Sequence, residues 1–282
     1  MKNNKAFKTQ HGRDEVLKYY DKLLEKLTIS YERLNISTCH GNTFCIAAGD
    51  LSAPPMVLLH GSSMNSCMWI SDILKYHQTY RVYAVDIPGE AGRSDERQLP
   101  FTTSDLDDWL YDVFKILSID KAVLIGASLG AWLSAKFAIS YPEKIDKLVL
   151  LCPAGIGTQN KKFIFTALFY MLLGEKGIRR LFKIINGNVE IPEIMFKFQI
   201  LIGKHFNTRK EPIPIFSDDE IRHLTMPVFI FVGAKDIMLH SMETAERMKK
   251  LVPHANINIL PEAGHSIINL TDTILEQIKI NL

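Results

Sequence analysis

Short apolar runs alternate with longer helix-like segments along most of the chain. Each run has four or five residues, the length of a strand that is buried on both faces. Helix-like segments separate several of these runs, so the connections are expected to be crossovers between parallel strands. The pattern predicts an α/β fold whose mostly parallel sheet has helices on both faces. The expected strands are 56–59, 82–85, 122–125, 148–151, 228–232 and 257–260, and the clearest linking helices are 103–117 and 129–140.

The beginning of the chain has a different pattern. Apolar residues recur at helical spacing over about residues 13–27, which predicts an amphipathic helix that packs on the main body. Two strand-like stretches follow at 32–38 and 43–48, and the sequence His40-Gly41-Asn42 lies between them. A short glycine-containing connection of this kind predicts a hairpin turn. The sheet is therefore expected to begin with a hairpin.

The alternation of strands and helices breaks between residues 153 and 216. This segment is rich in Phe, Ile, Leu and Lys, contains at least three helix-like pieces and has no convincing strand. It ends at Ser217-Asp218-Asp219-Glu220, a capping-box pattern that predicts the start of a short helix. We interpret 153–216 as a helical lid inserted into a core formed by residues 1–152 and 217–282. The alternative is a set of core helices within one domain.

Composition excludes several classes of protein. The 282 residues are 47% hydrophobic and 23% charged, which are values typical of a globular protein. The formal net charge is only +2, and the tightest basic group falls at helical spacing, as expected for a solvated helix face. No nucleic-acid partner is therefore expected. The basic group is Lys176, Arg179, Arg180 and Lys183.

Cysteine spacing and apolar length bear on the environment of the protein. The four cysteines lack the spacing of a metal site or a disulfide framework, so we expect free, mostly buried thiols in a reducing compartment and no bound metal. Residues 1–15 are polar and lack the apolar region of a signal peptide. The longest apolar stretch, 163–173, is too short to span a membrane. We expect a cytoplasmic monomer or homodimer without a membrane span.

The first candidate for chemistry is the pentapeptide Gly126-Ala127-Ser128-Leu129-Gly130. It lies between the expected strand 122–125 and the expected helix 129–140, so Ser128 would stand on a tight strand-to-helix turn. Such a turn crowds the residues on either side of the serine, and Gly126 and Gly130 occupy the positions where no side chain fits. The pattern predicts that Ser128 is a nucleophile.

A nucleophilic serine needs a base within hydrogen-bond reach and a third group that orients the base. In an open parallel sheet, ligands bind beyond the carboxyl ends of the strands. Asp236 follows the expected strand 228–232, and His265 follows the expected strand 257–260. Their order after Ser128, first the acid and then the histidine, is the order that accompanies a G-x-S-x-G serine on an α/β sheet. We therefore expect Asp236 and His265 to complete a catalytic triad.

With these residues in view, the chain resembles the α/β-hydrolase fold superfamily from about residue 31 to residue 282. Within it, the chain is most similar to bacterial carboxylesterases of the naproxen-esterase-like group, judged by the N-terminal helix and by Tyr83-Ala84-Val85-Asp86-Ile87 running into Gly89-Glu90. The motifs that carry the resemblance are His60-Gly61, Asp86-Ile87-Pro88-Gly89, the pentapeptide around Ser128, Gly233-x-x-Asp236 and Gly264-His265.

The resemblance implies roles for further residues. The backbone N–H groups of Ser62, which follows His60-Gly61, and of Leu129, which follows the nucleophile, would bind the oxyanion. The family's D-x-P-G-x-G-x-S run is one residue longer here, over residues 86–94, so the loop beside the pocket is expected to differ in shape. The residues expected to line the substrate pocket are Ser63, Met64, Phe165, Phe169 and Met238.

Together these features predict a serine hydrolase that cleaves carboxylic esters of small, fairly hydrophobic molecules through an acyl-enzyme, without a cofactor. A serine in place of an aspartate argues against haloalkane-dehalogenase and epoxide-hydrolase chemistry. Thioesters, lactones, C–C bonds and peptides stay open as substrates, because all of them are cleaved by a similar serine turn and the fold does not choose among them. A non-catalytic ligand-binding protein on the same scaffold is the alternative from another class.

Overall fold

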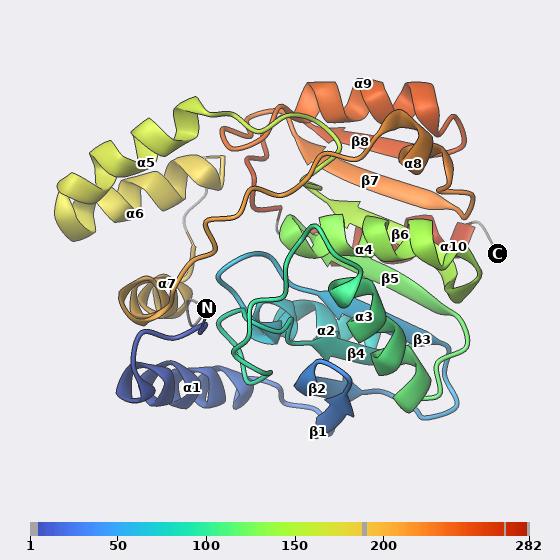
Figure 1. Cartoon of the computed structure of the whole chain (residues 1–282), viewed down its shortest axis with the longest axis horizontal. Coiled ribbons are helices and arrows are strands. Elements are labelled where there is room, and N and C mark those ends of the chain that lie inside the picture. The colour runs from blue at the N-terminus through green and yellow to red at the C-terminus, as the bar shows by residue number, and fades with distance from the viewer. Residues whose placement is uncertain (1–4, 188–190, 268, 281–282) are drawn as a thin grey trace.

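The computed structural model describes residues 5–187, 191–267 and 269–280, and a single eight-stranded sheet lies at its centre (Figure 1). Its strands are β1 (Tyr31–Thr38), β2 (Gly41–Ala48), β3 (Pro55–Leu59), β4 (Arg81–Val85), β5 (Ala122–Ala127), β6 (Ile145–Leu151), β7 (Val228–Gly233) and β8 (Asn256–Leu260). The order across the sheet is β1-β2-β4-β3-β5-β6-β7-β8. β2 runs antiparallel to both of its neighbours, whereas every pairing from β4 to β8 is parallel. The predicted α/β fold with a mostly parallel sheet is confirmed.

Helices cover both faces of this sheet because alternate strand residues point to opposite faces. In β3, for example, Val57 and Leu59 enter one hydrophobic cluster, and Met56 and Leu58 enter the other. The helices are α1 (Gln10–Leu24), α2 (Ile70–Tyr76), α3 (Asp105–Ile116), α4 (Leu129–Ser140), α5 (Lys162–Leu172), α6 (Gly174–Ile185), α7 (Glu193–His205), α8 (Asp218–Arg222), α9 (Ser241–Leu251) and α10 (Thr271–Ile280), with short 3-10 turns at Ser66–Trp69 and Pro142–Lys144. α3, α4, α8 and α9 contribute to the first cluster, and α1, α2, α7 and α10 to the second.

The N-terminal helix lies three residues earlier than the interval 13–27 that the apolar spacing predicts. α1 begins at Gln10 because the side chain of Thr9 accepts a hydrogen bond from the Gly12 N–H and caps the first turn. It ends at Leu24, and Leu27 is buried beyond the helix end. The periodicity of apolar residues therefore continued past the true end of the helix.

The segment 153–216 holds α5, α6 and α7 and, within its described residues, no strand of the sheet. α5 and α6 pack against each other as a hairpin to one side of the sheet, and α7 packs against α1 (Figure 1). Gly177 permits the close approach of the two hairpin helices, since a Cβ atom there would lie 2.0 Å from the Tyr170 carbonyl oxygen. Residues 206–216, which we call the strap, then return the chain to α8. The capping box at Ser217 and Glu220 forms as the sequence predicts.

Within the described residues, none of the helices combines the length and the apolar character needed to cross a membrane.

Candidate active site

Ser128 stands on a strained turn between β5 and α4. Its backbone has φ +52° and ψ −108°, a conformation that residues with a side chain rarely adopt, and its N–H donates to the Leu151 carbonyl at 2.8 Å. A Cβ atom on Gly126 would lie 2.3 Å from the Gly130 carbonyl oxygen, and one on Gly130 would lie 2.2 Å from the Leu59 carbonyl oxygen. Both glycines are therefore required for the turn to close, and the turn presents the Ser128 hydroxyl beyond the end of β5.

The structure brings Ser128, His265 and Asp236 together in one hydrogen-bonded row. The Ser128 Oγ lies 2.9 Å from His265 Nε2, and His265 Nδ1 lies 2.8 Å from Asp236 Oδ2. Ser128 follows β5, His265 follows β8 and Asp236 follows β7, so the row lies at the carboxyl ends of the strands from β5 to β8. A hydroxyl, an imidazole and a carboxylate in this arrangement can move a proton from the serine to the histidine.

The Asp236 carboxylate is held in its ionised form. Burial acts to raise its pKa, but the hydrogen bond and positive charge of His265 and the backbone N–H groups of Met238 and Leu239 together outweigh burial, and the pKa lies below its ordinary value. Those two N–H groups donate to Asp236 Oδ1 at 2.7 and 3.0 Å. The other oxygen, Oδ2, is left to orient the imidazole.

The two backbone N–H groups expected to bind the oxyanion lie on separate elements. Ser62 follows β3, and Leu129 is the first residue of α4. In the part of the chain that the structure describes, neither N–H donates to a protein acceptor. Unused N–H groups next to a nucleophile can stabilise an oxyanion.

His60 is fully buried, and both of its ring nitrogens contact backbone groups. Its Nδ1 lies 2.8 Å from the Gly61 carbonyl oxygen, and its Nε2 lies 2.9 Å from the Ile87 N–H. A neutral ring with the proton on Nδ1 satisfies both contacts, and burial lowers the pKa of His60 in agreement with a neutral ring. His60 therefore holds the loop that carries Ser62 against the end of β4.

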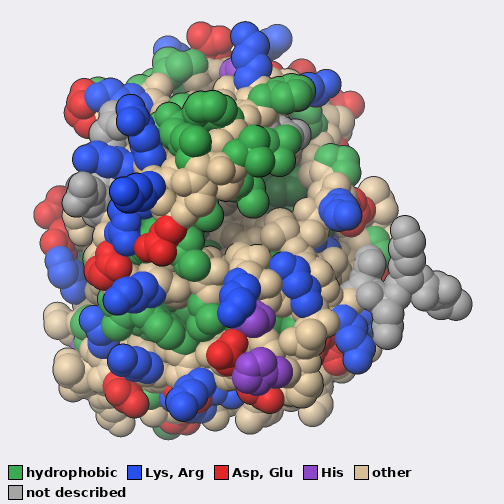
Figure 2. Space-filling view, turned by 90° about the vertical axis from the view of Figure 1, so that its left-hand side faces the viewer, with side chains coloured by type: hydrophobic (Ala, Val, Ile, Leu, Met, Phe, Trp, Pro, Cys, Tyr) green, Lys and Arg blue, Asp and Glu red, His purple; other side chains and the backbone are tan. Residues whose placement is uncertain are grey.

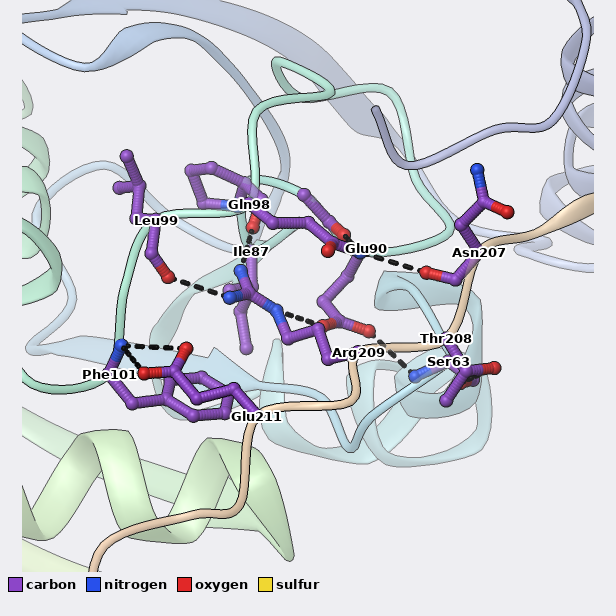
Figure 3. A network of polar contacts seen from close by, with 12 residues as sticks. Ser63, Ile87, Glu90, Gln98, Leu99, Phe101, Asn207, Thr208, Arg209 and Glu211 are labelled. Atoms are coloured by element: carbon purple, nitrogen blue, oxygen red, sulfur yellow. Dashed lines mark hydrogen bonds and ion pairs between the residues drawn. The ribbon is translucent and has the colours of Figure 1, made fainter. Parts of the chain in front are cut away.

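Sequence reasoning missed a buried ion pair behind Ser63 (Figure 3). Glu90 has a fully buried side chain and Arg209 one that is 5% exposed, and Arg209 Nε lies 3.0 Å from Glu90 Oε1. The second carboxylate oxygen accepts the N–H of Ser63 at 2.7 Å. Burial raises the pKa of Glu90 to about 7, although the Arg209 guanidinium and the Ser63 N–H act to lower it. The loop 86–94 is longer than the family's usual run, and this lengthened loop supplies the carboxylate.

The strap and the loop meet through this pair. Arg209 also donates to the carbonyl oxygens of Leu99 at 2.6 Å and Pro88 at 3.2 Å, and its guanidinium lies over the Phe101 ring at 4.7 Å. Glu211 accepts the Phe101 N–H at 3.2 Å (Figure 3). From sequence, only the acidic residue Glu90 in the lengthened loop could have indicated a basic partner such as Arg209.

A second contact joins the hairpin to the histidine. The His265 N–H donates to the carbonyl oxygen of Ile185, the last residue of α6, at 2.7 Å. Gly264 makes this contact possible, because a Cβ atom there would lie 2.1 Å from the same oxygen. The position of the imidazole is therefore tied to the end of α6.

The apolar residues expected in the pocket fall into two groups. Met64 and Met238 are half-buried and pack against the two clusters of the core. Phe165 and Phe169 lie on α5 and are 75% and 59% exposed. Figure 2 shows the molecular face that carries α5 and α6, with a hollow beside its hydrophobic side chains. That these residues and Ser63 line the substrate pocket stays a prediction.

One group of side chains in the described residues has metal-ligand spacing. Ligand atoms of Cys152, Asp236 and His265 lie within 4.8 Å of one another. Burial and the neighbouring Asp236 raise the pKa of the Cys152 thiol, so it stays protonated, and the facing atoms of Asp236 and His265 already bond each other. The group therefore fits a metal ion poorly.

Comparison with known proteins gives consistent results for sequence and structure. Residues 54–175 match the family described as alpha/beta hydrolase fold. The chain is 30% identical to carboxylesterase YbfK of Bacillus subtilis over 256 residues, which are 87% of this chain and 86% of that protein. The crystal structure of YbfK superposes with a TM-score of 0.84 at 27% identity, covering 96% of this chain and 97% of that one. The crystal structure of a naproxen esterase from the same bacterium gives a TM-score of 0.84 at 27% identity, covering 97% and 99%.

Proposed function

We propose that this chain, which belongs to the α/β-hydrolase fold family and is a carboxylesterase-type hydrolase, cleaves carboxylic esters of small, fairly hydrophobic molecules through an acyl-enzyme on Ser128. The observation that carries the proposal is the row from Ser128 Oγ through His265 to Asp236, with successive distances of 2.9 and 2.8 Å. A strained turn that presents a hydroxyl to a positioned imidazole supports nucleophilic catalysis.

In the first half-reaction, Ser128 Oγ attacks the ester carbonyl carbon while His265 Nε2 accepts the hydroxyl proton. His265 then returns this proton to the leaving alcohol as the C–O bond breaks. In the second half-reaction, water attacks the acyl-enzyme, His265 takes a proton from the water, and the proton passes to Ser128 as the acid leaves. Throughout, Asp236 accepts a hydrogen bond from the Nδ1–H of His265 and stabilises the positively charged imidazole.

The N–H groups of Ser62 and Leu129 bind the negatively charged oxygen of each tetrahedral intermediate in this proposal. This assignment is supported because neither N–H group donates to a protein acceptor within the described residues. We also propose that residues 153–216 form a lid beside the site. The bond from the His265 N–H to Ile185 and the bonds of Arg209 to the loop support a lid that is attached to the core on both sides.

The triad assignment is tested by substitution and by a fluorophosphonate probe. We expect wild type to be labelled and Ser128→Ala to be unlabelled while folded. His265→Ala and Asp236→Asn should each lower kcat for a short-chain aryl ester by at least about 10³-fold, because the members of a triad act as a unit. The exposed residues His11 and Asp120 offer matched controls, His11→Ala and Asp120→Asn, which should keep full turnover. Labelling of Ser128→Ala at the wild-type level would disprove the assignment.

Substrate class is tested separately with a panel of esters, thioesters, lactones and aminoacyl amides compared by kcat/KM. A preference for simple esters with hydrophobic acyl or alcohol groups supports the proposal. A higher kcat/KM for thioesters or lactones would leave the triad assignment intact and would reject simple esters as the substrate class. A folded wild type that neither accepts the fluorophosphonate nor turns over any member of the panel would reject enzymatic function and favour ligand binding.

A further inference from the structure

Exposed large hydrophobic side chains are concentrated on the α5–α6 hairpin. Half of the large hydrophobic side chains that are exposed in the described residues lie between positions 165 and 173. Four of them recur at helical spacing, so α5 presents one apolar stripe to the outside. Contiguous exposed apolar surface of this kind marks an interaction site. The stripe consists of Phe165, Leu168, Phe169 and Leu172, and Met171 and Leu173 are exposed beside it.

The second helix of the hairpin carries a basic stripe with the same spacing. Residues 161–187 contain six basic residues and one acidic residue, a net charge of +5, whereas the whole chain has a net charge of +2. All four basic residues of α6 line a hollow of about 650 Å³, together with Glu193 and Phe196. Arg179 pairs with Glu193 at 2.7 Å across this hollow. The basic stripe consists of Lys176, Arg179, Arg180 and Lys183.

Apolar and basic side chains thus occur together on one surface. Figure 2 shows hydrophobic side chains gathered on the face that carries α5 and α6, with basic side chains beside them. This combination is complementary to an anionic bilayer, in which acyl chains accept the apolar stripe and headgroups attract the basic one. α5 has 11 residues, too few to span a bilayer, so it would lie in the plane of the interface.

A second copy of this chain fits the same surface less well. A two-fold symmetric contact places the same patch on both partners, so the basic stripe of one copy would approach the basic stripe of the other. An anionic lipid surface gains attraction from the same charges. We propose that the α5–α6 hairpin docks on an anionic lipid surface, with the apolar stripe of α5 in the interface and the basic stripe of α6 against the headgroups.

Vesicle flotation with the full chain tests this proposal. We expect wild type to float with vesicles of phosphatidylcholine and phosphatidylserine, and to float weakly with phosphatidylcholine alone. Leu172 is 86% exposed, and Leu172→Asp should weaken binding at least about tenfold by placing a charge in the interface. Lys176→Glu combined with Arg180→Glu should weaken binding to the anionic vesicles to a similar degree.

Two matched variants control for the general effects of added charge. Leu51 is exposed to a similar extent, 79%, but lies between β2 and β3, so Leu51→Asp should bind like wild type. Lys249→Glu combined with Lys250→Glu makes the same change in net charge on the exposed side of α9 and should also bind like wild type.

Three outcomes would overturn the proposal. The first is no vesicle binding by wild type. A wild-type dimer that does not bind vesicles and that Leu172→Asp converts to a monomer would be such a case. The second is equal binding to vesicles with and without phosphatidylserine. The third is equal weakening by the hairpin variants and their controls. Hydrolysis of a soluble short-chain ester should stay at the wild-type level in every variant, so failure here is distinguishable from failure of the esterase proposal.

Discussion

The two ends of the segment 153–216 differ in what they expose and what they bury. The α5–α6 hairpin leaves apolar side chains in water and makes few contacts with the sheet. The strap at 206–216 instead buries polar groups: Arg209 donates to one carboxylate and two carbonyl oxygens, and its guanidinium lies over the Phe101 ring. One segment thus combines an end that is held by directional bonds with an end that exposes an apolar surface.

This difference indicates which substitutions should change stability and which should change association. A buried charged group depends on its partner, because removing the partner leaves a charge that neither water nor protein satisfies. An exposed apolar side chain has no such dependence, and its replacement changes what the surface can bind rather than whether the chain folds. The strap should therefore report on stability, and the hairpin on association.

Loss of Arg209 should produce the largest effect on stability. Arg209→Met leaves the Glu90 carboxylate buried without its guanidinium, and we expect the free energy of unfolding to fall by about 3–5 kcal/mol in urea titrations. Glu90→Met combined with Arg209→Met should recover most of the loss, since no charge is then left unpaired. Lys210→Met, at an exposed neighbour in the strap, should be neutral. A loss below about 1 kcal/mol in Arg209→Met would remove the contrast between strap and hairpin.

The pH dependence of stability should show an intermediate effect in the strap. Burial raises the pKa of Glu90 to about 7 from its ordinary value of 4.5, so between these pH values the native state keeps a proton that the unfolded chain has lost. Stability contributed by this group is therefore complete below about pH 4.5 and is lost as the pH rises through about 7.

The measurement for this effect is the unfolding free energy of wild type relative to Glu90→Gln, which does not titrate. The difference should shift against wild type by about 2–3 kcal/mol between pH 5 and pH 8. A difference that is constant with pH would mean that the Glu90 pKa is the same in the folded and unfolded states. The difference between wild type and Leu172→Asp, which both keep Glu90, should show no comparable slope over this window.

The smallest effect on stability is expected in the hairpin. Leu172→Asp should change the free energy of unfolding by less than about 0.5 kcal/mol, because the side chain is exposed and leaves no cavity. Urea titration of this variant beside Leu51→Asp checks the expectation. A loss above about 1.5 kcal/mol would show that the apolar stripe packs against protein, and the comparison between the two ends would then fail.

Much of the fold was predictable because its signals are local. Each of the strands β3 to β8 carries its own apolar run, and Gly126 and Gly130 indicate a tight turn that no residue with a side chain permits. Chain order and strand ends were enough to select Asp236 and His265, which the structure brings beside Ser128. The roles of these residues stay a prediction.

The remainder depends on contacts that have no local signal. Glu90 and Arg209 are 119 residues apart, and neither position alone indicates that the other will be buried beside it. Apolar residues on α5 look the same in sequence whether they face a pocket, the core or solvent. Helical periodicity defines a stripe, but only tertiary structure decides whether the stripe is covered.

The backbone at Ser128 has an evolutionary consequence. Glycine would fit this left-handed turn with less strain, yet glycine offers no hydroxyl. Under the role proposed for Ser128, selection for folding and selection for turnover act in opposite directions at this position. In a lineage that lost its chemistry while keeping the scaffold, this serine is where sequence drift toward a more relaxed backbone should first become visible.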